Sequence, residues 1–113
     1  MRIDKDLVAA SATPLVLGIL NDGSSYGYAI LKQIRELSAG ELDWTDGMLY
    51  PLLHRLERLG HVQAAWDRAE NGRRRRVYAI TATGREALRE RQRQWDVVDK
   101  ALRGLQLPRA VLA

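Results

Sequence analysis

Leucines recur at helical spacing in the middle of the chain, at steps of three or four residues: Leu49, Leu52, Leu53, Leu56 and Leu59. This spacing predicts a helix with one continuous buried stripe. Thr45 is a suitable cap for its start, and Gly60 is the residue type that commonly ends a helix. The opposite face, which helical geometry turns toward solvent, is predicted to hold Gly47, Tyr50, Pro51, His54 and Arg58.

An earlier helix is predicted from Asp4 to Asn21, with Asp4 or Asp6 available as its cap. Its apolar positions are Leu7, Val8, Leu15, Leu17, Ile19 and Leu20. Pro14 lacks the amide that a helix interior needs. The helix therefore either kinks between Ala10 and Pro14, or restarts there with Thr13 as its cap, and the sequence leaves both alternatives open.

A short helix and two strands complete the middle of the chain. Residues 21–25 have the composition of a turn, and Gly27 to Ser38 follows as a helix. Its apolar positions are Ile30, Leu31, Ile34 and Leu37. The segments Val62 to Asp67 and Arg74 to Ile80 are rich in strand-forming residues. Because the turn dipeptide Asn71-Gly72 lies between them, they are predicted to form a hairpin.

A long last helix is predicted from about Ala82 to Leu105, with Thr81 as its cap and with Gly104 and Pro108 near its end. Apolar residues recur along it in two rows with a seven-residue step: Leu88, Trp95 and Leu102, then Val98 and Leu105. Arg91 is the polar interruption of this seam. A small domain cannot bury the whole seam, so we expect a homodimer, paired through this helix and through the first. The alternative is a helix that folds back on its own domain.

The charge of the chain is concentrated in one place. The 113 residues carry a formal net charge of +4, and the stretch Arg68 to Arg76, with five Arg and one Glu, accounts for all of it. This stretch includes the predicted hairpin turn and four consecutive arginines, Arg73 to Arg76. A protruding cationic loop favours a polyanionic partner. The alternative interpretation is a solvated run of charge.

Other chemistry finds little support in the composition. The chain has no cysteine, which excludes disulfides and thiolate sites and favours a reducing, cytoplasmic location. The charged start does not look like a secretory signal, and the longest apolar run, residues 14–20, is too short to span a membrane. His54 and His61 have no partners at metal-ligand spacing, and the serines have no neighbouring His to activate them. We therefore expect no enzyme, no metal and no cofactor.

The order of the elements, three helices and then a hairpin with a basic tip, predicts a winged helix-turn-helix. The fold class is mostly α with a small β-hairpin and a long C-terminal helix. Residues 1–80 would form the DNA-binding domain, and residues 81–113 the dimerisation helix and tail. The predicted contacts to double-stranded DNA come from the third helix, the residue that caps it and the arginine run: Thr45, Gly47, Met48, Tyr50, Pro51, His54, Arg55, Arg58, Arg73, Arg74, Arg75 and Arg76.

Three motifs spread over nearly the whole chain resemble the PadR family of bacterial transcriptional regulators. They are Tyr26-Gly27-Tyr28, Leu49-Tyr50-Pro51-Leu52-Leu53-His54-Arg55-Leu56-Glu57-Arg58-Leu59-Gly60, and residues 73–84, with four arginines before Val77-Tyr78 and with Thr81 and Gly84. The short ending of the last helix, especially Trp95-Asp96-Val97-Val98-Asp99-Lys100, resembles that of the compact multidrug-responsive (LmrR-like) subgroup. The resemblance implies a dimeric repressor that binds an inverted-repeat operator and releases it when a small aromatic compound binds. It also implies that Tyr50 lies at the DNA face.

The sequence departs from the family pattern at three places. Met48 stands where a small Thr is common, His61-Val62 where Leu-Ile is usual, and Ala82-Thr83 where charged residues often precede the glycine. Because Met48 is next to the predicted DNA face, it puts the family's operator sequence in doubt for this member.

A ligand site is predicted in the middle of the seam. Two symmetry-related Trp95 side chains could clamp a planar aromatic compound, with Asp99 one helical turn away as a counter-charge for a cation. Arg91 favours an aromatic acid instead, and Leu7 and Ala10 of the first helix would complete the site. The alternative is that Trp95 fills the dimer core and Asp99 pairs with Arg103.

The alternative function for the whole chain is a winged-helix module that binds an acidic protein surface rather than specific DNA.

Overall fold

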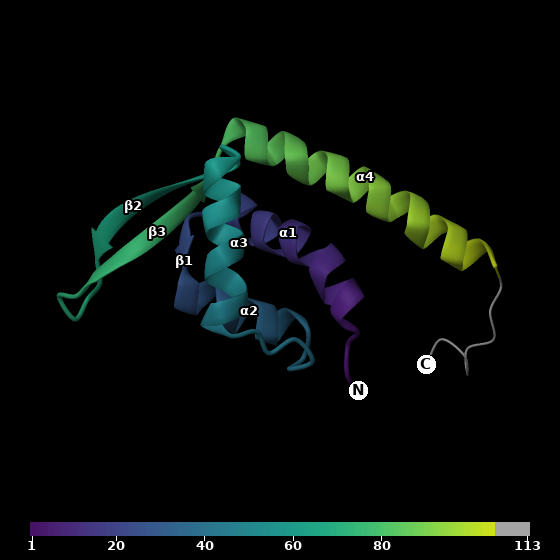
Figure 1. The fold of residues 1–113 in the computed structure, drawn as a ribbon, viewed down its shortest axis with the longest axis horizontal. Helices are drawn as coiled ribbons and strands as arrows, with labels where there is room; N and C mark the ends of the chain where they lie inside the picture. Colours follow the sequence, from purple (N-terminus) through teal and green to yellow (C-terminus); the bar gives the residue numbers. More distant parts are fainter. Residues whose placement is uncertain (106–113) are drawn as a thin grey trace.

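The computed structural model describes residues 1–105 as four helices and a small antiparallel sheet (Figure 1). In chain order the elements are α1 (Lys5–Asn21), β1 (Ser25–Tyr26), α2 (Gly27–Leu37), α3 (Asp46–Arg58), β2 (Val62–Arg68), β3 (Arg74–Ile80) and α4 (Ala82–Gly104). The predicted fold, a mostly helical winged helix-turn-helix with a long last helix, is confirmed. Pro108 and the rest of the tail lie outside the described residues.

The sheet has three strands in the order β1-β3-β2, one more than the sequence predicted. The predicted hairpin is present, since β2 pairs with β3 from Val62 opposite Ile80 to Arg68 opposite Arg74. Strand β1 consists of two residues, with Ser25 opposite Tyr78 and Tyr26 opposite Val77. Two residues are too few to show an alternating pattern, so this strand exists only because β3 supplies its hydrogen-bonding partner.

Helix α1 continues through Pro14, which answers the question that the sequence left open. The helix does not restart at Thr13, because Thr13 is itself a helical residue and its side chain is buried against the rest of the protein. The missing amide of Pro14 would have bonded the carbonyl of Ala10, and Ala10 is exposed, so water can satisfy that carbonyl. Asp4 occupies the N-cap position without a side-chain cap bond.

The core lies where α1, α2 and α3 meet the inner face of the sheet. Its buried apolar residues are Val16, Leu17, Ile19, Leu20, Ile30, Leu31, Ile34, Trp44, Leu49, Leu52, Leu53, Leu56, Val62, Tyr78, Ile80 and Leu88. Three leucines predicted as core positions, Leu7, Leu37 and Leu59, are instead about half exposed or more. Each lies near an end of its helix, where packing against the core is incomplete. Leu59 already follows the last helical residue.

Gly60 ends α3 as predicted, with a left-handed φ of 77°. The amide of His61 then donates to the carbonyl of Leu56 at 2.9 Å, which closes the end of the helix. The chain turns here into β2, so the leucine stripe of α3 stops at Leu56.

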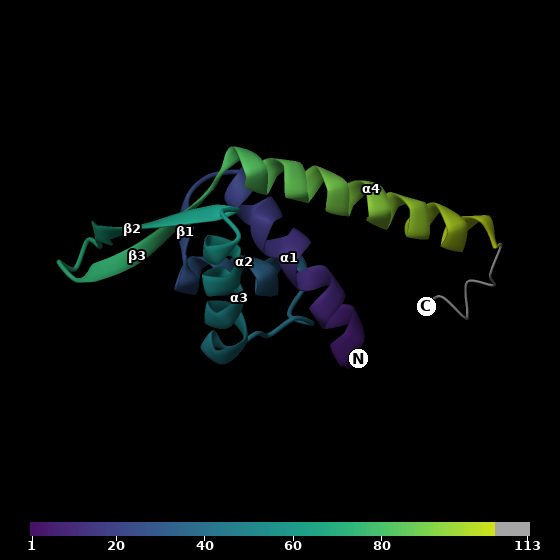
Figure 2. The same ribbon diagram turned by 45° about the horizontal axis from the view of Figure 1, so that its top comes forward.

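Helix α4 starts in firm contact with this body and then leaves it. The Thr81 Oγ1 atom accepts the amide of Gly84 at 3.1 Å, as the predicted cap requires, and donates to the Gly60 carbonyl at 2.6 Å. Leu88 is part of the core, whereas the apolar residues further along are exposed: Trp95, Val97, Val98, Leu102 and Leu105. The hairpin and α4 thus project from opposite sides of the helical body (Figures 1 and 2).

Candidate nucleic-acid interface

Helix α3 has one buried face and one open face. The leucines Leu49, Leu52, Leu53 and Leu56 point into the core. The opposite side exposes Gly47, Met48, Pro51, His54, Arg55 and Arg58. An α-helix held this way presents a row of side chains of the kind that enters the major groove of DNA.

Tyr50 is placed differently from the sequence prediction, because it is half-buried rather than fully turned to solvent. Its hydroxyl end lies against the start of α2, so closely that a Cβ atom added at Gly27 would collide with it. The ring is 6.5 Å from that of His54 and tilted by 45°. A glycine at position 27 therefore lets Tyr50 fill the junction between α2 and α3.

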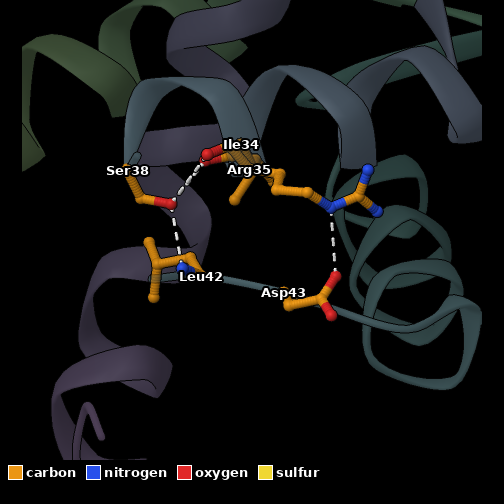
Figure 3. Close-up of polar contacts among 5 residues, drawn as sticks. All are labelled: Ile34, Arg35, Ser38, Leu42 and Asp43. Carbon is orange, nitrogen blue, oxygen red and sulfur yellow. Dashed lines mark hydrogen bonds and ion pairs between the residues drawn. The ribbon is translucent and has the colours of Figure 1, made fainter. Parts of the chain in front are cut away.

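The loop between α2 and α3 is fixed by polar contacts (Figure 3). The Ser38 Oγ atom donates to the carbonyl of Ile34 at 2.9 Å and accepts the amide of Leu42 at 2.9 Å. The Nε atom of Arg35 donates to Asp43 Oδ1 at 3.1 Å. These bonds tie the loop to the last turns of α2 and so set the direction in which α3 begins.

Thr45 is the N-cap residue of α3, as predicted, but its side chain makes no capping bond. Its carbonyl accepts the amides of Met48 and Leu49, each at 3.1 Å. The Thr45 side chain is exposed at the start of the open face, where its hydroxyl is free of a bond to the helix.

The hairpin turn contains Asn71-Gly72, as predicted, but its loop has three residues, 70–72, rather than the two of a simple Asn-Gly turn. The amide of Ala69 donates to the Arg73 carbonyl at 2.8 Å, and Gly72 has a φ of 81°. The Asn71 Oδ1 atom accepts the amide of Arg73 at 3.0 Å. Of the four consecutive arginines, only Arg73 belongs to the turn, since the other three are part of β3.

The four arginines differ in their surroundings. Arg73 and Arg74 are exposed, whereas Arg75 and Arg76 are partly buried. The guanidinium carbon of Arg75 lies 3.9 Å from the ring centroid of Tyr26. Arg76 Nη2 donates to Glu57 Oε2 at 3.0 Å. The run is therefore not a uniform charged surface.

The open face of α3 and the inner face of the hairpin meet at a hollow of about 460 Å³. It is lined by Tyr26, Gly27, Tyr28, Tyr50, His54, Trp66, Arg74, Arg75, Arg76 and Tyr78. Sequence reasoning did not include Tyr26 or Trp66 in the site. The observed register places Trp66 opposite Arg76. A two-residue turn at Asn71-Gly72 would have placed Trp66 opposite Val77 instead, so the turn dipeptide alone does not find this contact.

A second cavity, of about 570 Å³, lies between α1 and α4. Of the predicted ligand residues, Leu7, Arg91 and Trp95 line it, and Ala10 and Asp99 do not. The face of α1 that lines this cavity consists of Leu7, Ser11, Pro14, Leu15 and Gly18, and Ala10 lies outside that face. Asp99 Oδ2 instead accepts a bond from Arg103 Nε at 2.8 Å, and the carboxylates that line the cavity are Glu41 and Asp96.

Residues 1–105 contain no group of three or more His, Asp or Glu side chains placed to hold a metal ion. Within the same residues, no helix is long and apolar enough to cross a bilayer.

Comparison with known proteins identifies a family. The profile described as transcriptional regulator PadR-like family matches residues 16–90. The transcriptional regulator Rv3488 of Mycobacterium tuberculosis is 40% identical over 70 residues, which cover 62% of this chain and 64% of that protein. A transcriptional regulator from Clostridium thermocellum superposes with a TM-score of 0.81 at 26% identity, over 91% of this chain and 100% of the other. A PadR family transcriptional regulator from Eggerthella lenta gives a TM-score of 0.76 at 31% identity, over 88% and 85% of the two chains.

Proposed function

The chain belongs to the PadR-like family of transcriptional regulators, and from this premise we propose that it is a repressor that binds an inverted-repeat operator as a homodimer. We further propose that a small aromatic compound, bound at the dimer interface in the space that α1 and α4 border, lowers the affinity for the operator. Members of the family are DNA-binding regulators and not enzymes.

One observation carries the proposal for DNA binding. The open face of α3 and the cationic hairpin share the hollow that Tyr50, His54 and Trp66 line, so both can approach one duplex at the same time. Helix α3 would lie in the major groove, with base and backbone contacts from Thr45, Gly47, Met48, Tyr50, Pro51, His54, Arg55 and Arg58. The hairpin would reach the adjacent phosphates.

The proposal for a homodimer rests on the exposed part of α4. Trp95, Val98, Leu102 and Leu105 are between 46% and 63% exposed and lie on one side of the helix. A second copy can cover them by pairing its own α4 in the same way. A two-fold dimer presents two copies of α3, which suits an inverted repeat. In this division, residues 1–80 bind DNA and residues 81–113 supply the dimer contact.

The proposal for ligand binding rests on the second cavity. Its volume of about 570 Å³ suits a small organic molecule, and Leu7, Leu15 and Trp95 give it an apolar lining. Trp95 can stack on a planar ring. Arg91 and Asp96 both border this space, so a cation and an anion each have a potential partner.

The experiment is selection of duplexes from a random pool by the purified protein, followed by titration of the selected and scrambled sequences over a range of salt. We expect the selected sequence to contain an inverted repeat and to bind at least about a thousandfold more tightly than the scrambled one. Weak binding that is equal for all duplexes would contradict the proposal and favour a module that binds an acidic protein surface.

A further inference from the structure

The arginines of β3 alternate between two faces of the hairpin, and each face offers a different aromatic partner. Strand alternation turns Arg75 away from Arg74 and Arg76, and it lies beside Tyr26 of the neighbouring strand β1, at the edge of the same hollow. Arg74 and Arg76 are on the inner face, 4.8 Å and 5.7 Å from the ring centroid of Trp66. The two faces therefore connect the hairpin to different parts of the molecule.

Arg76 connects the hairpin to α3. Its partner Glu57 is the second last residue of that helix, 3.0 Å away, and the two side chains are 38% and 34% exposed. A carboxylate near the C-terminal end of a helix is disfavoured by the helix dipole, so Glu57 gains from a cation at this place. Partial burial and a direct hydrogen bond make such a pair stronger than an ordinary surface ion pair.

Arg75 connects the same strand to α2. Tyr26 immediately precedes the first residue of α2, and a guanidinium carbon 3.9 Å from its ring centroid is within the range of a cation-π contact. Two consecutive residues of β3 thus contact Glu57 in the last turn of α3 and Tyr26, the N-cap residue of α2. Together these contacts restrict how the hairpin tilts relative to α3.

Arg73 and Arg74 have no such ties to the helices. Both are exposed, and within residues 1–105 neither forms an ion pair. Trp66 packs beside Arg74 but is itself 57% exposed, so it directs the guanidinium without covering it.

We propose that Arg75 and Arg76 are positioning residues, which fix the angle between the hairpin and α3, and that Arg73 and Arg74 contact the DNA phosphates. The inference rests on the proposed function. A phosphate contact by Arg76 would compete with Glu57 for the charge of the guanidinium, whereas Arg74 can reach a phosphate with no ion pair to compete.

The variant Glu57→Gln distinguishes a positioning role of Arg76 from a phosphate contact, because the two roles change operator affinity in opposite directions. If Arg76 contacted phosphate, removal of a nearby negative charge would release it and raise the affinity for operator and random duplex alike. If Arg76 positions the hairpin, the variant loses operator affinity by about tenfold while random duplex is bound as well as before or better. The measured quantity is the ratio of the two affinities, from fluorescence anisotropy.

The salt dependence supplies a second measurement with matched variants. Arg74→Gln and Arg76→Gln each remove one charge from the same face of the hairpin. Each phosphate contact contributes about 0.9 to the slope of log affinity against log salt concentration. We expect Arg74→Gln to lower the slope by about that amount, and Arg76→Gln to lower operator affinity with the slope unchanged.

Arg76→Lys keeps a cation for Glu57 and should retain most of the operator preference. Circular dichroism melting of each variant shows that the fold is intact. An equal loss of slope in Arg76→Gln and Arg74→Gln, or a rise in operator affinity with Glu57→Gln, would overturn the inference alone. A wild-type protein with no preference for any duplex would overturn the proposed function as well.

Discussion

At the scale of single residues, two glycines of α4 lie in opposite surroundings. A Cβ atom at Gly84 would collide with the backbone carbonyl of His61 and lie 2.8 Å from Ile80 Cγ1, whereas one at Gly104 would meet nothing within 4 Å. We expect Gly84→Ala to destabilise the protein by roughly 1–3 kcal/mol, because the start of α4 must shift. Gly104→Ala should be neutral or stabilising, by at most about 1 kcal/mol. Urea unfolding measures the stability of both variants. An equal change in the two would contradict the prediction, because it would mean that the contact of Gly84 with His61 and Ile80 adjusts at little cost.

The second residue prediction concerns Tyr78, whose side chain is 1% exposed. Burial raises the pKa of its phenol above the ordinary value of 10.0, although the nearby Arg76 guanidinium opposes this. A pKa that is higher in the folded than in the unfolded state stabilises the fold below about pH 10, and this contribution is lost as the pH rises through the folded-state value.

We therefore expect the wild type to lose stability above about pH 10 more steeply than Tyr78→Phe, which has no proton to lose at this site. Unfolding midpoints measured from pH 8 to pH 11 test this. Tyr28→Phe is the control, because the Tyr28 side chain is 70% exposed. Parallel curves for wild type and Tyr78→Phe would contradict the prediction.

At the scale of elements, the buried face of α3 should determine the stability of the fold, and its open face should determine DNA binding. Leu53 is fully buried, so Leu53→Ala should destabilise the fold by roughly 2–5 kcal/mol through the cavity it leaves. His54→Ala should change stability by at most about 0.5 kcal/mol and weaken operator binding. Tyr50→Phe keeps the ring that packs on α2 and should also fold normally while it binds the operator less well.

Thermal unfolding and anisotropy titrations on the same three preparations measure these effects. Unfolding of Tyr50→Phe would mean that its hydroxyl has a structural role at the junction with Gly27. Unchanged operator affinity in both Tyr50→Phe and His54→Ala would exclude this face of α3 as the reading surface.

At the scale of the whole molecule, the exposed side of α4 predicts the oligomeric state. Val98 and Leu102 are 58% and 51% exposed, and two glutamates in their places should prevent a second copy from packing there. The double variant Val98→Glu, Leu102→Glu is expected to be monomeric in sedimentation equilibrium. Arg89→Gln with Lys100→Gln changes the net charge by the same amount on the opposite face, and this control should remain a dimer.

Trp95 tests the ligand site at the same scale. In a variant whose Trp44 and Trp66 are replaced by Phe, a planar aromatic dye is expected to quench the remaining indole emission. Trp95→Ala should keep the dimer, because Val98, Leu102 and Leu105 still pair, but lose dye binding. A cationic dye, an aromatic acid and a non-aromatic compound are compared. Equal weak binding of all three would leave Trp95 as ordinary dimer contact.

The sequence by itself determined the features that depend on neighbours along the chain. The leucine spacing of α3, the Asn71-Gly72 turn and the cap at Thr81 each act within a few residues, so local patterns predict them. The motifs shared with the PadR-like family also follow from the order of residues alone. They fixed the order of the elements, the winged-helix fold and the location of the positive charge.

Only the tertiary structure decided the features that depend on residues far apart. Strand β1 forms because β3 lies beside it, and α1 runs on through Pro14, where Val16 and Leu17 are buried in the core against the other elements. Residues 73–76 are all arginine, yet only the structure shows that Arg75 lies over the Tyr26 ring and that Arg76 pairs with Glu57. A charge acquires its role from the distance to its partners, and that distance exists only when the distant segments have packed together.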